Sequence, residues 1–148
     1  MDAESRSTFF YVRGFSMWPL IRNGEIIKVR YLEPKYLKRG DILLYKDGQT
    51  LLCHRLVRKV KLQAPQFFVQ CDSAPGSSVA VGQEEVLGKV VAVKRKDRFL
   101  ILDRGVLRLL GMLLVIFGCY LRWLPPFLRT IKKGKIIKLY NGASSFYR

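Results

Sequence analysis

The sequence predicts a mainly β fold, in which a small antiparallel β domain is followed by one hydrophobic helix near the carboxyl terminus. Segments rich in Val, Ile, Leu, Phe and Tyr recur between residues 9 and 93, and these residue types favour strands. Turn signals built on Gly, Asn and Asp separate the segments. Beyond residue 99 the pattern changes to a long apolar run with basic flanks. We therefore expect a β-rich domain over residues 1–98 and a basic, hydrophobic region over residues 99–148.

Within the first region, five short segments are expected to be strands. Asp47-Gly48 lies between two of these apolar segments, an arrangement typical of a β-hairpin. The stretch 31–40 has room for a single helical turn before the next strand. The expected strands are residues 25–32, 41–46, 50–62, 66–71 and 88–96.

The second region contains an apolar run, residues 109–121, without a charged residue. As a helix this run would span about 20 Å, which is less than the roughly 30 Å hydrocarbon core of a bilayer. Arg108 and Arg122 flank the run, and Trp123 follows as an interfacial residue. These features favour a helix over residues 106–124 that lies in or dips into a membrane. A core helix packed on the β domain is the alternative that a run of this length also permits.

The charge of the chain points to anionic partners. Its 27 Lys and Arg residues against 11 Asp and Glu residues give a formal net charge of +16, which suits nucleic acid or an anionic membrane surface. In the β region the basic residues alternate with apolar ones, as they do on solvated strand faces. We therefore expect a membrane surface with anionic lipids, and no nucleic acid, as the partner.

Cysteine and histidine content argues against a metal centre. The three cysteines, Cys53, Cys71 and Cys119, are widely spaced and form no CxxC pair, and His54 is the only histidine. This spacing argues against a zinc site, and no cofactor is expected. Reduced thiols and an amino terminus without a signal-like apolar core suit a membrane-associated protein whose β domain faces the cytosol.

Three residues are candidates for nucleophilic catalysis. Ser16 follows Gly14, which permits an unusual backbone angle and close approach of a substrate chain. A nucleophilic serine needs a base, and His54, with an ordinary pKa near 6.5, would remove its proton near neutrality. Asp72 would orient that histidine, as in a catalytic triad. The structural alternatives are a solvated turn serine, a structural histidine and an acid that caps a turn.

These residues occur in segments that resemble, in order, the conserved boxes of the signal peptidase I and LexA-like serine proteases. "GFSMWPLIRNGEIIKV" resembles the serine box, and "KRGDILLYK" resembles the box that follows it. "LLCHRLVRKV" resembles the base-bearing box, in the histidine form of the endoplasmic-reticulum and archaeal-type signal peptidases. "FFVQCDSAP" and "VLGKVVAV" resemble the last two boxes. The resemblance covers residues 11–94.

The resemblance implies a β-rich serine endopeptidase that cleaves a leader or signal segment from a peptide or protein substrate. Ser16 would be the nucleophile of an acyl-enzyme reaction, His54 the general base and Asp72 the triad acid. Arg55, which follows the histidine, would be a positioning residue. Three further residues of the serine box are expected to contribute to substrate or oxyanion binding: Gly14, Met17 and Pro19.

The chain departs from the family pattern at three points. The acidic pair that supplies the triad acid is replaced by "GSSVAV", and Cys71 replaces the usual glycine before Asp72. Either Asp72 takes the acid role or the site is a Ser–His dyad with another third partner. Gly14 stands where a hydroxyl residue often donates to the oxyanion, so that role would pass to the Ser16 N–H. The missing acid and the bulky Phe15 and Trp18 favour the alternative function, a non-catalytic membrane-associated peptide-binding module with the same fold.

Overall fold

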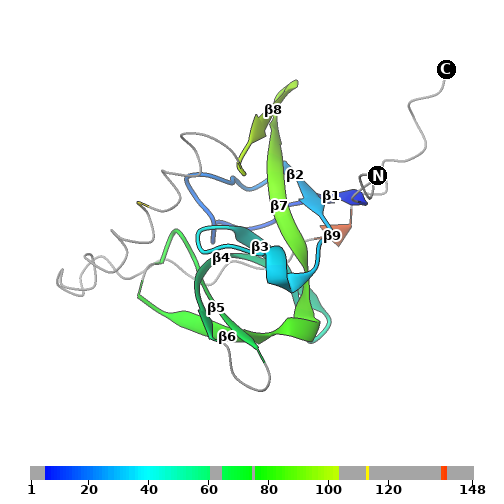
Figure 1. Ribbon diagram of the computed structural model, residues 1–148. Coiled ribbons are helices and arrows are strands. Elements are labelled where there is room, and N and C mark those ends of the chain that lie inside the picture. Colours follow the sequence, from blue (N-terminus) through cyan, green and yellow to red (C-terminus); the bar gives the residue numbers. More distant parts are fainter. Residues whose placement is uncertain (1–5, 61–64, 75, 104–112, 114–137, 140–148) are drawn as a thin grey trace.

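A computed structural model of the chain describes residues 6–60, 65–74, 76–103, 113 and 138–139 (Figure 1). Its strands form one antiparallel sheet in the order β6-β5-β4-β3-β7-β2-β1-β9, and β8 pairs with β7 beside this path. The elements are β1 (Ser7–Tyr11), β2 (Ile26–Arg30), η1 (Pro34–Tyr36), β3 (Ile42–Asp47), β4 (Thr50–Val60), β5 (Gln66–Gln70), β6 (Ser78–Gly82), η2 (Gln83–Glu85), β7 (Val86–Arg95), β8 (Arg98–Ile101) and β9 (Lys138–Leu139), where η denotes a 3₁₀ helix.

The mainly β class is confirmed, and each of the five expected strands is present. Asp47 pairs with Thr50 at the end of the β3–β4 hairpin, and Gly48 has a φ of 58° there, a conformation that glycine adopts at little cost. The expected helical turn is η1. The helix expected over residues 106–124 lies outside the described residues, apart from Leu113. No helix in the described part of the chain is long and apolar enough to cross a membrane.

Two strands use residues that were assigned to the carboxyl-terminal region. β8 crosses the boundary expected at residue 98 and pairs Ile101 with Ala92 of β7. Leu102 beyond it is buried, whereas Phe99 and Ile101 are exposed, which is the period-2 pattern of a strand. β9 pairs with the outer edge of β1. The sheet therefore extends past residue 98.

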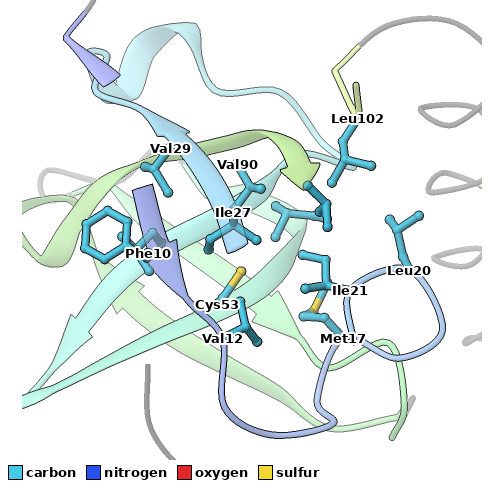
Figure 2. Close-up of a cluster of buried hydrophobic side chains, with 13 residues drawn as sticks. Phe10, Val12, Met17, Leu20, Ile21, Ile27, Val29, Cys53, Val90 and Leu102 are labelled. Carbon is cyan, nitrogen blue, oxygen red and sulfur yellow. The ribbon is translucent and has the colours of Figure 1, made fainter. Parts of the chain in front are cut away.

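The sheet bends around two hydrophobic cores, and alternate residues of β3 and β4 face one core or the other. The first core lies under β1, β2 and β7, and the loop between β1 and β2 covers it with Met17, Leu20 and Ile21 (Figure 2). Cys53 faces this first core, whereas Leu52 and Leu56 of the same strand face the second. The buried residues of the second core are Leu37, Leu43, Tyr45, Leu56, Phe67, Val69 and Val81.

Candidate functional site

Ser16 lies on a turn that is anchored on both sides. The Trp18 N–H donates to the Phe15 carbonyl at 3.1 Å, so Ser16 is the second residue of a hydrogen-bonded β-turn. Gly14 precedes the turn with a φ of 120°, a backbone conformation that residues with a side chain rarely adopt. This angle explains why glycine, and not a hydroxyl residue, occupies that position.

The other members of the serine box have structural partners. Met17 is only 3% exposed and packs in the first core, so its side chain anchors the turn and does not line an open substrate site. The Gly14 N–H donates to Asn23 Oδ1 at 2.9 Å and is not free to bind an oxyanion. Pro19 follows the turn directly and is exposed.

The loop after β5 is bonded directly to Ser16. The Ser16 carbonyl accepts hydrogen bonds from the N–H and from the hydroxyl of Ser73, both at 3.1 Å. Among the described residues, neither the Ser16 hydroxyl nor the Ser16 N–H has a hydrogen-bond partner. Every buried polar side-chain atom of this part of the chain has a partner, and Ser16 itself is half-buried, so a Ser16 hydroxyl that has no partner among these residues is not sealed in the core.

His54 lies on β4, opposite Leu43 of β3, and both of its ring nitrogens have partners. Nδ1 is 2.8 Å from the Tyr45 hydroxyl, and Nε2 is 3.1 Å from Cys71 Sγ. Burial lowers the pKa of His54 to about 4, because the charged ring loses its hydration. The imidazole is therefore neutral at pH 7 and able to accept a proton. Cys53 faces the opposite side of the strand, as expected.

Asp72 pairs with Arg55 instead of His54. Arg55 Nε donates to Asp72 Oδ1 at 2.7 Å, and Arg55 Nη2 donates to Oδ2. The two side chains are 3% and 4% exposed, and Arg55 also donates to the Gly40 carbonyl. Burial raises the pKa of the Asp72 carboxyl, and the Arg55 guanidinium opposes that shift. Within the described residues Asp72 makes no hydrogen bond to His54, so this geometry gives it the role of joining the loop after β5 to β4.

Tyr45 and Cys71 are the residues of the site whose roles sequence reasoning missed. Tyr45 is buried, and burial raises the pKa of its phenol, which therefore stays protonated. Burial also raises the pKa of the Cys71 thiol, so the group facing Nε2 is neutral. The hairpin at Asp47-Gly48 was a usable signal for Tyr45, because its register places Leu43 opposite His54 and Tyr45 at the diagonal position, within reach of long side chains.

The arrangement fixes what the ring of His54 can do. When Nδ1 carries the ring proton, it donates to the Tyr45 oxygen, and Nε2 keeps the lone pair that a base needs. In this state the Cys71 thiol donates to Nε2. The thiol therefore occupies the nitrogen that would have to accept a serine proton. The site therefore combines a neutral base, a solvent-accessible serine and a thiol that competes for the base.

Comparison with known proteins supplies no relative: the chain matches no protein-family model and no curated protein.

Proposed function

We propose that the chain is a signal peptidase-like serine endopeptidase that removes a leader or signal segment from a peptide or protein substrate. The observation that supports this most directly is the position of His54. Its neutral ring is held by Tyr45 at Nδ1, and its Nε2 is directed at Cys71, two residues before the Ser73 that binds the Ser16 carbonyl. A base and an unbonded serine hydroxyl are thus joined through one short loop.

The proposed reaction begins when the Cys71 thiol releases Nε2. Ser16 Oγ attacks the substrate carbonyl carbon and gives its proton to Nε2, and the oxyanion is bound by the Ser16 N–H. The C–N bond then breaks, and His54 returns the proton to the leaving amine. Water attacks the resulting ester with His54 again as the base, which releases the acid and restores Ser16.

Tyr45 takes the place of a triad acid in this proposal. Its oxygen accepts a hydrogen bond from Nδ1–H and so holds the tautomer that leaves Nε2 basic. A neutral phenol stabilises the imidazolium formed in the reaction less than a carboxylate would, because it carries no charge. We therefore expect a slow enzyme.

One observation favours the alternative, a non-catalytic peptide-binding module. Among the described residues no hydrogen bond joins the Ser16 hydroxyl to His54, and Nε2 is already occupied by the Cys71 thiol. If this contact is permanent, the domain would bind peptides without cleaving them.

A cleavage assay separates the two functions. The chain, Ser16→Ala, His54→Ala and the control Ser77→Ala, at an exposed serine of the loop before β6, are incubated with leader-bearing precursor peptides, and products are identified by mass spectrometry. We expect the chain and Ser77→Ala to give one cleavage site and the other two variants to give none. Undiminished cleavage by Ser16→Ala would exclude the proposed nucleophile. Peptide binding by all four proteins without cleavage would support the binding module.

A further inference from the structure

The turn that carries Ser16 presents two large aromatic side chains to solvent. Phe15 is 56% exposed and Trp18 is 53% exposed. They are the first and fourth residues of the hydrogen-bonded turn, whose end Cα atoms lie within about 7 Å of each other. The candidate nucleophile is therefore flanked by two exposed rings.

The backbone that carries these rings is anchored by the rest of the loop. Met17, Leu20 and Ile21 point inward and seal the first core (Figure 2). The Ile21 N–H donates to the Met17 carbonyl at 2.9 Å, and Arg95 donates to the Leu20 carbonyl at 3.0 Å. Because Met17, Leu20 and Ile21 fill the inward positions of the loop, Phe15 and Trp18 remain on its outer side. Exposed apolar groups on a fixed loop mark an interaction surface.

The charge around the rings identifies the kind of partner. Arg13 and Arg22 are exposed at the two ends of the loop, and residues 13–24 contain no acid. The next acid, Glu25, is bonded to Arg95 and largely buried. Aromatic side chains between arginines, in a segment without an acid, match the interface of an anionic bilayer, where rings enter the head-group region and guanidinium groups bind phosphates.

We propose that the loop Arg13–Arg22 docks on an anionic membrane, with Phe15 and Trp18 inserted in the interface and Arg13 and Arg22 bound to lipid phosphates. Docking requires no catalysis. Its functional consequence, which rests on the proposed function, is that Ser16 cleaves peptide bonds lying at the membrane surface.

Trp18 provides a local test. The sequence has two tryptophans, Trp18 and Trp123, so the variant Trp123→Phe reports on Trp18 alone. It is mixed with vesicles of phosphatidylglycerol and phosphatidylcholine, with or without brominated acyl chains, and with vesicles of phosphatidylcholine only. We expect a blue shift and bromine quenching of Trp18 with the anionic vesicles and weaker effects with the neutral ones. Trp18 fluorescence unchanged by anionic vesicles would overturn the proposal, even if the chain binds them through other residues.

Substitutions test the contacts. Replacing Phe15 and Trp18 together by Ser should weaken co-sedimentation with anionic vesicles at least about tenfold, and each of Arg13→Gln and Arg22→Gln should weaken it about fivefold. Tyr36→Ser, at a tyrosine that is 60% exposed, is the matched control and should bind as the unmodified chain does. Equal losses in the control and in the double variant would contradict the proposal.

The two proposals fail separately. If Ser16→Ala in the Trp123→Phe background shows quenching but the chain cleaves no peptide, docking stands and the peptidase function fails. If the chain cleaves soluble peptides but Trp18 responds only to peptide and never to vesicles, the peptidase function stands and the loop is a peptide contact.

Discussion

At the scale of single residues, the partners of His54 and Arg55 decide the chemistry. Adjacent strand residues point to opposite faces, so these two neighbours on β4 cannot share one partner. Their partners are also adjacent in the sequence: Cys71 contacts His54, and Asp72 binds Arg55. The motif resemblance predicted Ser16, His54 and Asp72 as a set, but it could not show that Asp72 binds Arg55 and not His54. That pairing depends on the face of the sheet to which each of these side chains points.

His54 should give an acidic pH profile. The base is active when neutral, and burial lowers its pKa to about 4, so kcat/KM should stay level down to about pH 5 and fall as the pH passes through 4. The ordinary value near 6.5 would place the fall more than two units higher. The measurement is kcat/KM for precursor cleavage between pH 3 and pH 8. A midpoint near 6.5 would show that the ring is solvated in the working enzyme.

Tyr45→Phe should lower kcat about tenfold to a hundredfold with little change in KM, because it leaves Nδ1 without its partner at a cost of about 1–3 kcal/mol. The variant should also move the acidic limb of the pH profile, which a purely structural change would not do. Tyr36→Phe, at an exposed tyrosine, serves as the control. An unchanged kcat and pH profile in Tyr45→Phe would remove Tyr45 from the proposed mechanism.

Cys71→Gly tests the competition for Nε2. Removing the thiol frees the nitrogen that Ser16 needs, and since one hydrogen bond is worth about 1 kcal/mol, kcat should rise about fivefold. Cys71→Ser keeps a donor at the same position and should leave kcat near that of the unmodified chain. A fall in kcat in Cys71→Gly would mean that the thiol assists the reaction instead of blocking it.

At the scale of elements, most of the sheet could be predicted, and the failures have a physical pattern. The strands β2, β3, β4, β5 and β7 carry alternating or continuous apolar residues bounded by turns, and each was predicted. β1 lies between β2 and β9 in the sheet and was not among the expected strands. β6 and β9 are short edge strands, whose formation depends on pairing with distant residues more than on local sequence. β8 could not be recognised as a strand in the sequence, because no turn signal separates its apolar residues from the apolar segment that follows. Pairing with β7, and not composition, decides that residues 98–101 are a strand.

The Arg55–Asp72 ion pair, which joins β4 to the loop after β5, should contribute strongly to the free energy of unfolding. Asp72→Ala leaves the guanidinium buried without its counter-charge, so the free energy of unfolding should fall by about 3–5 kcal/mol. Chemical denaturation followed by tyrosine and tryptophan fluorescence measures this loss. Asp47→Ala, at an exposed acid of the β3–β4 hairpin, should change stability by less than about 1 kcal/mol. A similar small effect in Asp72→Ala would show that solvent enters and hydrates Arg55.

At the scale of the whole molecule, the buried neutral histidine couples folding to pH. In the unfolded chain His54 titrates near 6.5, and in the folded protein its pKa is about 4, so below pH 6.5 the unfolded state binds the proton more tightly. Stability is then full above about pH 6.5 and decreases as the pH falls to 4, by about 3 kcal/mol at most.

His54→Gln isolates this contribution, because glutamine fills similar space and does not titrate. The free energy of unfolding of both proteins is measured between pH 4 and pH 7, where the unmodified chain should lose stability more steeply than the variant as the pH falls. Carboxylate titrations contribute to both curves, so the difference between the two slopes belongs to His54. Parallel curves would mean that the pKa of His54 is the same in the folded protein and in the unfolded chain. The buried, neutral base with a lowered pKa would then be absent from the proposed mechanism.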